Sequence, residues 1–376
     1  MSGVLPDLRL RKAIDEGWIR GAAGGNVQPA SLDLTLGPAA HRLRCSFLPD
    51  SKSVEDKLAE HSMGAFDLRD GAILERNRPY LIPLREGLAL PGDVRAKANP
   101  KSSTGRLDIF TRVITDQSFR FDEVSAGYAG PLYLEVVTRS FTVRVREGLS
   151  LNQLRLVEGA GGARVTDADI RSIHAEEPLL FSEGRPVAAS GLAVADGLFM
   201  SLDLRRVPAG APVGYRAKKN SQLLDLSAVE RYDPELFWEP VVPERQDRLI
   251  LEPEEFYLLL SAESVSVPPA YAAEMTAYDP TSGELRTHYA GFFDPGFGFD
   301  RAGRLNGSRA TLEVRAHDVP FMVEHRQPVC KLSFDRMAEP PHALYGEEIG
   351  SHYQSQQVTL SKHFQRPVVA PPSSST

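Results

Sequence analysis

Apolar and polar residues alternate over short segments along most of this chain. The alternation is clearest at 80–98, 131–137, 141–145 and 151–159. In an extended strand every second side chain lies on the same face, so each segment can bury one face against a core. Gly, Pro and Asn interrupt the pattern at intervals of roughly ten residues, a spacing typical of sandwiches, barrels and jelly rolls. The pattern therefore predicts a mainly β protein.

Three segments depart from the alternation. Residues 5–20 carry apolar side chains at the loose spacing of a short amphipathic helix. Residues 160–195 are more polar and predict a helical stretch, after which strand-like alternation resumes. The end of the chain, 367–376, is rich in Pro and Ser and is expected to be disordered.

Several short motifs occur twice, in the same order and at a nearly constant separation. A single match would be chance. Besides the shared SLDL motifs, however, several matches have an offset of 177 or 178, and such a series indicates a repeated unit. The chain is therefore expected to comprise a first β unit (1–160), a linker with a helical segment (161–194), a second β unit (195–366) and the tail. The matching positions are Ser31–Leu34 with Ser201–Leu204, Tyr80 with Tyr257, Glu135 with Glu313, and Leu154 with Leu332.

Length and composition agree with a two-unit globular protein and exclude several classes. The chain has 376 residues, of which 42% are hydrophobic and 25% charged. A net charge of −7 argues against a surface that holds nucleic acid nonspecifically. Two cysteines, Cys45 and Cys330, cannot form a disulfide framework. The charged start of the chain and the lack of a long apolar run predict a cytoplasmic protein without a membrane contact.

The segment KSSTGR is the first candidate for chemistry. It places Lys101, Ser102, Ser103 and Arg106 at the end of an expected strand. Two cations supply charge, and hydroxyls with loop amides supply donors, which is the chemistry of a phosphate site. We call residues 101–106 the phosphate loop.

Two glutamates within apolar strands are candidates for a general base. Burial would raise the pKa of Glu135 or Glu313 toward the range in which a carboxylate accepts a proton from water. A zinc deaminase is not indicated: His174–Glu176 fits the first half of its motif, but no Cys pair follows.

In order, the helical segment, QPASLDLTLG, KSSTGR and LYLEVV resemble the pattern of dCTP deaminases of the dUTPase-like superfamily, as do FFDPGFG and SHYQSQQVTLSKHF in the second unit. The resemblance implies two distorted β-barrel or jelly-roll units, threefold assembly, and hydrolysis of dCTP to dUTP and ammonia. It also implies Mg²⁺ bound through the substrate triphosphate, no zinc, and dTTP as a candidate inhibitor.

The same resemblance suggests roles for individual residues. It makes the serines and arginine of the phosphate loop triphosphate ligands, with Ser102 also helping to order the catalytic water. Asp294 belongs to the Asp-Pro-Gly turn of the family, and Tyr353 and Gln357 to the tail that closes over the nucleotide. Lys101 stands where most members have arginine, which keeps the charge but not the bidentate geometry.

The two units have kept different parts of the pattern. In the first, 125–127 replaces the Asp-Pro-Gly turn. In the second, Asp279 and Glu284 place acidic residues in the segment that corresponds to the phosphate loop, where they would repel a triphosphate. Asp33 and Asp203 of the SLDL motifs are expected to pin a turn or an interface.

Two arrangements of the site are compatible with these differences. If each unit forms its own threefold ring, the phosphate loop works with Glu135, and closed symmetry favours this because a ring of three cannot alternate two kinds of unit. If the units combine, the loop works with Glu313. The symmetry argument makes Glu135 the preferred base.

Three functions remain open at this point. The leading one is a dCTP deaminase. A dUTPase, or an enzyme that does both steps, would share the fold, although the glycine-rich closing tail of dUTPases is missing from the sequence. A nucleotide-binding protein with decayed catalysis would also explain the altered motifs.

Overall fold

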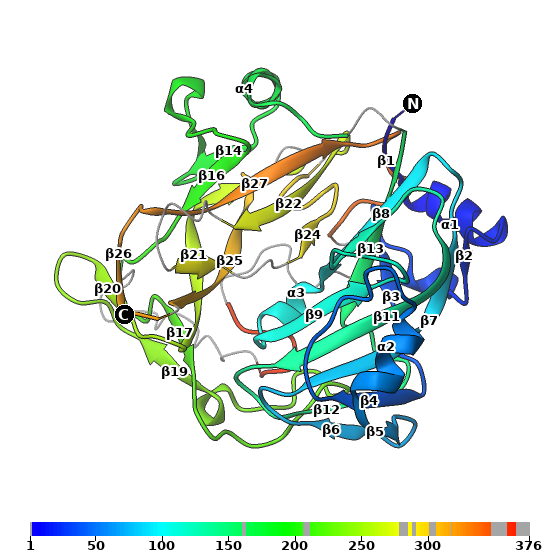
Figure 1. Ribbon diagram of the computed structural model, residues 1–376. Helices are drawn as coiled ribbons and strands as arrows, with labels where there is room; N and C mark the ends of the chain where they lie inside the picture. Colours follow the sequence, from blue (N-terminus) through cyan, green and yellow to red (C-terminus); the bar gives the residue numbers. More distant parts are fainter. Residues whose placement is uncertain are drawn as a thin grey trace, which may run out of the picture.

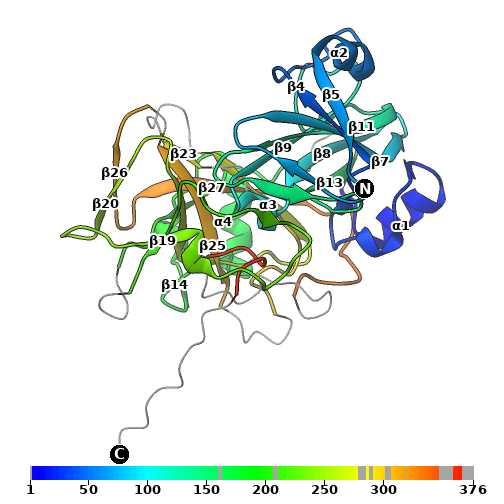
Figure 2. The ribbon, with the colours of Figure 1, turned by 90° about the horizontal axis from the view of Figure 1, so that it is seen from below.

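The computed structural model describes residues 2–159, 163–205, 211–277, 285–287, 291–300, 306–316, 318–346 and 359–365. Two mainly β units lie side by side, the first in blue to cyan and the second in green to orange in Figure 1. Figure 2, seen from below, shows the same division. The mainly β architecture expected from the alternation is therefore confirmed.

Two antiparallel sheets form most of the first unit, and β6 and β12 form a third sheet with β18 (Leu224–Asp225) of the second unit. One has the order β1-β13-β8-β10, with β3 also paired to β13, and the other has the order β5-β4-β7-β11-β9, with β2 also paired to β7. The strands are β1 (Gly3–Val4), β2 (Ile19–Arg20), β3 (Leu32–Leu34), β4 (Ala39–Leu43), β5 (Ser62–Asp67), β6 (Ala72–Leu74), β7 (Pro79–Ala89), β8 (Val94–Pro100), β9 (Ile109–Ile114), β10 (Glu123–Val124), β11 (Ala129–Thr138), β12 (Val143–Val145) and β13 (Asn152–Glu158).

The second unit repeats this plan with different details. Its larger sheet has the order β15-β14-β21-β17-β19, with β25 on β21 and β23 on β25. The others are β16-β27-β22-β24 and β20-β26. The strands are β14 (Leu180–Ser182), β15 (Arg185–Pro186), β16 (Leu198–Ser201), β17 (Gly214–Ala217), β18 (Leu224–Asp225), β19 (Trp238–Val241), β20 (Arg248–Leu251), β21 (Phe256–Val265), β22 (Tyr271–Ala277), β23 (Leu285–Thr287), β24 (Phe292–Phe293), β25 (Ser308–Ala316), β26 (Phe321–Glu324) and β27 (Pro328–Arg336).

Helices occupy little of the described chain. The helix expected at 5–20 is shorter, α1 (Asp7–Asp15), because Gly17 adopts a left-handed φ of 78° just beyond it. The helical stretch at 160–195 contains α4 (Asp167–Glu176), but β14 pairs with β21, so part of the expected linker is built into the second unit. The others are α2 (Val54–His61), α3 (Ser102–Gly105) and the 3₁₀ turns η1 (Gly24–Asn26), η2 (Ala189–Gly191) and η3 (Pro234–Leu236).

Equivalent strand pairs of the two units share one register. Tyr80 of β7 lies opposite Val136 of β11, and Tyr257 of β21 lies opposite Val314 of β25. Each tyrosine hydroxyl accepts a hydrogen bond of 3.1 Å from the backbone N–H five residues before it. Glu135 and Glu313 therefore occupy matching strand positions.

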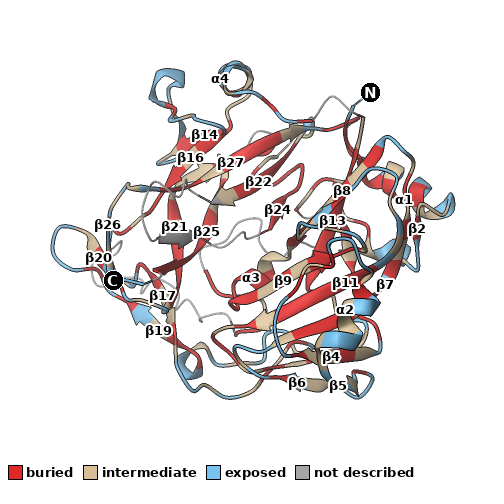
Figure 3. Ribbon diagram, viewed as in Figure 1, coloured by how far each residue is buried: buried red, intermediate tan, exposed pale blue. Residues whose placement is uncertain are grey.

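The units are joined by a shared core as well as by hydrogen bonds. Phe141 of the first unit packs edge-on against Trp238 of the second, with ring centroids 5.2 Å apart, inside one buried cluster. Strand β12 pairs in parallel with β18, which links Val143 to Leu224. Figure 3 shows buried residues along the strands of both units. No helix in the described residues has the length and apolar character needed to cross a membrane.

Candidate functional site

The phosphate loop lies at the junction of the two units, between β8 and β9. Residues 102–105 form the short α3, which is drawn next to the red segment of the tail in Figure 1. Arg106 is buried and donates from Nη1 to the carbonyls of Thr359, at 3.3 Å, and Leu360, at 3.4 Å. The Ser361 hydroxyl donates to the Ser103 carbonyl at 2.9 Å. The described part of the tail thus holds α3 in place.

Lys101 has an acidic partner within its own unit. Its ammonium donates to Asp33 of the SLDL motif, so this aspartate positions a phosphate-loop cation, as the expectation of a pinning role requires. Lys362 of the tail lies close by: burial and the positive charge of Lys101 lower the pKa of Lys362, and Asp33 opposes this. The position of Lys362 beside the loop could not be predicted from sequence, because a short surface-like motif gives no sign of where the tail folds back.

Glu313 faces the phosphate loop from the second unit. A Cβ added to Gly105 would lie 2.6 Å from Oε1 of Glu313 and closer still to Oε2, so the carboxyl occupies the space that the glycine leaves open. Glu313 is 1% exposed, and within the described chain its Oε2 has no hydrogen-bond partner. Burial raises the pKa of Glu313 well above its usual range; Arg106 lowers this pKa and Asp108 raises it.

Glu135 has different surroundings. Its Oε1 lies 3.7 Å from Nη1 of Arg112, and among the described residues its Oε2, like that of Glu313, has no hydrogen-bond partner. Burial raises the pKa of Glu135, and Ser46 and Arg112 lower it. The segment that carries α2 packs over this region, with Val54 buried against Tyr133. Among the described residues, no hydrogen bond or ion pair joins Glu135 to the phosphate loop.

Within one chain, the two unlike units pack on each other and bring Glu313, rather than Glu135, to Gly105. The symmetry argument for Glu135 concerns rings formed by several chains, so the choice of Glu135 stays a prediction. The approach of Glu313 to Gly105 could not be predicted from either unit alone, because it depends on side chains of both units.

Asp294 of the Asp-Pro-Gly turn lies in the interface between the units. Arg155 of the first unit donates to its Oδ1 at 3.0 Å, and Ser31 donates to its Oδ2 at 3.2 Å. The Arg155 guanidinium also lies 3.9 Å from the centroid of the Phe292 ring. Burial raises the pKa of Asp294, and Arg155 opposes this. The contacts of Asp294 are those of an interface residue, with its carboxylate engaged by the neighbouring unit.

A second polar contact beside the loop joins β8 to β22. Lys97 donates to Oε2 of Glu274 at 2.7 Å, and Asn99 donates to Oε1 at 3.3 Å. The backbone N–H of Gly291 in turn donates to Asn99 at 3.3 Å. Ser102 lies next to Gly291, where an added Cβ would stand 2.9 Å from the serine hydroxyl. The half-buried loop serine therefore lies against second-unit backbone.

Several expected residues lie outside the described residues: Tyr353, Gln357, Asp279 and Glu284. His174 is described and buried; its Nε2 contacts the Val187 carbonyl at 2.6 Å, and its Nδ1 accepts from the Leu179 N–H at 3.1 Å. Both ring nitrogens of His174 therefore contact the backbone of the segments that follow α4. In the parts of the chain that the structure describes, no group of three or more His, Cys, Asp or Glu residues is arranged to hold a metal ion.

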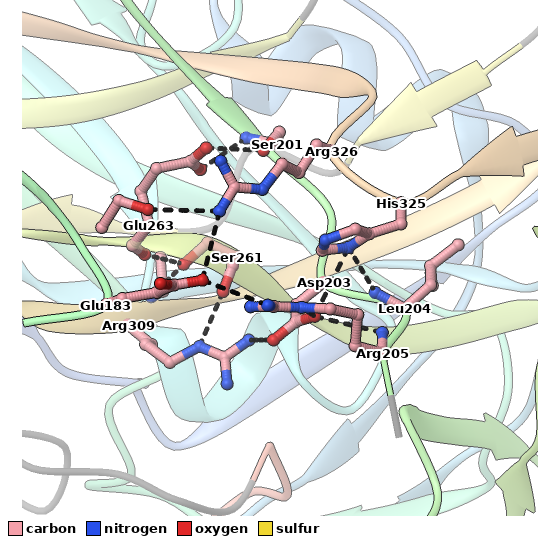
Figure 4. A network of polar contacts seen from close by, with 12 residues as sticks. Glu183, Ser201, Asp203, Leu204, Arg205, Ser261, Glu263, Arg309, His325 and Arg326 are labelled. Atoms are coloured by element: carbon pink, nitrogen blue, oxygen red, sulfur yellow. Dashed lines mark hydrogen bonds and ion pairs between the residues drawn. The ribbon is translucent and has the colours of Figure 1, made fainter. Parts of the chain in front are cut away.

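Asp203, the second SLDL aspartate, is at the centre of a separate network (Figure 4). It accepts from Arg309 at 2.8 Å and from Nε of Arg205 at 3.5 Å, and His325 lies 3.5 Å away. Glu183 extends the network by accepting from Arg205 at 3.1 Å. The cations that surround Asp203 come from its own unit, which fits the expected pinning role.

Comparison with known proteins supplies independent information. The model of the 2'-deoxycytidine 5'-triphosphate deaminase (DCD) N-terminal domain matches residues 1–160, and that of the C-terminal domain matches residues 166–364. A crystal structure of 2'-deoxycytidine 5'-triphosphate deaminase from Agrobacterium tumefaciens is 46% identical, with a TM-score of 0.85, over 93% of this chain and 99% of that chain.

Curated relatives match over shorter lengths. A dCTP deaminase from Acidianus ambivalens is 27% identical over 147 residues, which are 39% of this chain and 78% of that protein. A "dCTP deaminase, dUMP-forming" from Halobacterium salinarum is 34% identical over 119 residues, 31% of this chain and 56% of that protein. Together with the matches to both domain models, these similarities show that the chain belongs to the 2'-deoxycytidine 5'-triphosphate deaminase family.

Proposed function

We propose that this chain hydrolyses dCTP to dUTP and ammonia at a site shared by its two units, with Glu313 as the general base. The observation that carries the proposal is the approach of the Glu313 carboxyl to Gly105 of the phosphate loop, with its Oε2 lacking a hydrogen-bond partner among the described residues. A base and an anion-binding loop are thereby brought together across the junction. Family membership supplies the substrate class.

The phosphate loop would bind the triphosphate. Lys101 and Arg106 supply positive charge, and the hydroxyls of Ser102 and Ser103 supply further donors. Arg106 is fixed by the tail carbonyls and faces Glu313, so it is oriented before the nucleotide arrives. Such preorganisation lowers the cost of placing the cytosine against the base.

Glu313 would then move the proton. As a carboxylate it accepts a proton from water while the water oxygen bonds to C4 of cytosine, and Ser102 helps to orient that water. The protonated Glu313 returns that proton to the leaving amino group, and the bond between C4 and the exocyclic nitrogen breaks to release ammonia. The remaining proton of the added hydroxyl passes to N3 of the ring, which gives the C4 carbonyl and N3–H of uracil. One water is consumed, and one dUTP and one ammonia are formed.

The motifs that each unit has lost are consistent with a site to which the two units contribute different groups. The first unit supplies the cations, and the second supplies the base, so neither needs a full set of motifs. We infer that the chain arose as a tandem duplication in which the two copies specialised. The shared register of β7–β11 and β21–β25 supports this inference.

Ammonia release from dCTP by the purified protein tests the proposal. Glu313→Gln is expected to lower the rate by about 10²–10⁴-fold, the usual contribution of a general acid–base group, with dCTP binding retained. Glu135→Gln is the matched control, since it removes a buried carboxyl at the equivalent strand position. A loss confined to Glu135→Gln would instead support a site between first units, and binding without release by the unaltered chain would indicate decayed catalysis.

A second step deserves a separate assay because one relative is named as dUMP-forming. If the chain also cleaves dUTP, pyrophosphate will accumulate with ammonia. If the chain performs only deamination, dUTP will be the end product.

Other properties follow the resemblance. We propose that Mg²⁺ arrives bound to the triphosphate oxygens, that dTTP competes for the site, that the chains assemble with threefold symmetry, and that Tyr353 and Gln357 contribute to closing the site. Titration with EDTA and Mg²⁺, inhibition by dTTP, and the mass of the particle in solution test the first three.

A further inference from the structure

Asp108 occupies an unusual position just beyond the phosphate loop. Its backbone has a φ of 56°, a left-handed conformation that Asp tolerates better than most residues but that favours glycine. Its side chain is 1% exposed. Burying a carboxylate costs free energy, and so does a left-handed backbone at a residue other than glycine. Asp108 therefore needs a contact that compensates for both.

That contact comes from the other unit. Arg315 of β25 donates from Nη2 to Oδ2 of Asp108, and the hydroxyl of Ser140 donates to the same oxygen at 2.6 Å. The other end of the guanidinium donates from Nη1 to the carbonyl of Glu254. Arg315 is itself buried, so this is an interior ion pair that spans the junction.

Arg315 lies two residues after Glu313 on the same strand. Residues two apart in a strand project from the same face, so both side chains point from β25 toward the first unit. A guanidinium at that distance could turn to Glu313 and form a salt bridge with it. The described contacts show it directed to Asp108 and Glu254 instead.

The equivalent position in the first unit has no such cation. The common register of the strands aligns Val137 with Arg315, as it aligns Glu135 with Glu313. The guanidinium is therefore a feature of the strand that carries Glu313, and its acidic partner belongs to the turn that follows the phosphate loop.

We propose that Asp108 is a positioning residue that holds the Arg315 guanidinium away from Glu313, so that the carboxyl facing the phosphate loop stays unpaired and able to accept a proton. The inference rests on the proposed function of Glu313. Asp108 does not touch the reacting atoms in this arrangement; it acts through Arg315.

The charged groups around Glu313 are consistent with this role. Arg106 and Asp108 face it from the first unit, and their effects on its pKa oppose each other. Burial raises the pKa of Asp108 to about 6, against the effects of Arg315, Ser140 and Arg139. Glu254 accepts from Arg139 at 2.6 Å, which closes the network.

The test is the pH dependence of kcat for dCTP, since kcat reports groups in the enzyme–substrate complex. In Asp108→Asn the released guanidinium is expected to pair with Glu313 and lower its pKa, which the loss of the Asp108 charge lowers as well. The acid limb of the profile should then move down by about one pH unit, and kcat at neutral pH should fall by about 10-fold, with KM within about twofold of the original value.

A double variant separates this role from a purely structural one. In Asp108→Asn/Arg315→Met the competing guanidinium is also gone, so kcat should recover toward the original value. Recovery supports the proposal, whereas a double variant no more active than Asp108→Asn would overturn it. An unshifted acid limb in Asp108→Asn would overturn it as well.

Two further variants complete the design. Asp67→Asn, which removes an exposed carboxylate paired with Arg69, is the control for loss of charge and should leave the profile unchanged. If Asp108→Asn does not fold, Arg315→Met in an otherwise unaltered chain replaces it. An acid limb of kcat with its midpoint at the same pH as in the unaltered chain supports the proposal, and a midpoint at lower pH contradicts it. Absence of ammonia release from the unaltered chain would reject the proposed function, whereas release with unshifted profiles would reject this inference alone.

Discussion

At the scale of single residues, two buried glutamates at equivalent strand positions have different neighbours. Glu135 lies near Ser46 and Arg112 of its own unit, while Glu313 faces a glycine and an arginine of the other unit. Burial raises the pKa of both carboxyls, and among the described residues Glu313 is the one that lies against Gly105. The packing of the neighbouring unit, and not strand position alone, therefore distinguishes the surroundings of the two glutamates.

The raised pKa of Glu313 predicts the acid limb of the activity. A general base must be deprotonated, so kcat should fall as the pH drops through the pKa of Glu313. Because burial raises that pKa, the midpoint should lie above the ordinary value of about 4.3 for glutamate. Initial rates of ammonia release between pH 4.5 and 9, at saturating dCTP, measure it. A midpoint at or below the ordinary value would contradict the assignment of Glu313.

Arg106 offers a second prediction at this scale. The guanidinium donates to two tail carbonyls while facing the site, a geometry that a lysine ammonium cannot reproduce. Arg106→Lys should therefore raise KM for dCTP by about 10-fold or more, which corresponds to about 1.4 kcal/mol of binding free energy. Steady-state kinetics measure the change. Arg120→Lys, which alters an exposed arginine paired with Glu123, should leave KM unchanged.

The residues of the candidate site could be predicted from the sequence only in part. The phosphate-loop residues and both glutamates stand out because their types suit the chemistry, and KSSTGR matches a family pattern. The choice between the glutamates, and the roles of Asp108 and Arg315, depend on contacts between residues 207 positions apart along the chain. No periodicity or spacing encodes such a contact.

At the scale of elements, the close approach of α3 to β25 forms the site. Gly105 is the residue that permits this approach, because any side chain there would occupy the space of the Glu313 carboxyl. The short helix is held on its other side by the tail, through Ser103 and Arg106. The site thus consists of three segments that are far apart in sequence.

Gly105→Ala tests this approach directly. The added methyl would displace Glu313 or α3, and a shift of about 1 Å at a reacting group can lower the rate about 10²-fold. The rate of ammonia release is the measurement, and circular dichroism checks that the fold is retained. Gly92→Ala is the matched control, since a Cβ there meets nothing within 4 Å. Equal activities of the two variants would show that Glu313 does not work against α3.

Element type was easier to predict than element contacts. Alternation in the sequence identified β7, β8, β11 and β13, because a strand with one apolar face has a period of two, although β11 and β13 are buried on both faces over much of their length. The helix α2 was not expected, although Ser53 and Asp56 form a capping box that a search for that signature would have found. Helix caps are short signals, and they are easily missed between strands.

At the scale of the whole molecule, the two units behave as one body around a buried polar junction. Arg155 and Asp294 form an ion pair across it, with side chains 2% and 7% exposed. The two units also share a core, in which Phe141 of the first packs against Trp238 of the second. Packing between the units, rather than the symmetry of either one, places the phosphate loop and Glu313.

Arg155→Met therefore tests the molecule as a unit. Removing the guanidinium leaves Asp294 buried without its charged partner, a change that typically costs about 3–5 kcal/mol. The free energy of unfolding in guanidinium chloride should fall by that amount, and ammonia release should fall with it, because a shifted junction separates Glu313 from the phosphate loop. Arg69→Ala removes an exposed ion pair and should cost less than about 1 kcal/mol. If Arg155→Met lost stability but kept full activity, the junction would not be what holds the base in place, and the two halves of the site would have to be fixed by the tail and β12–β18 alone.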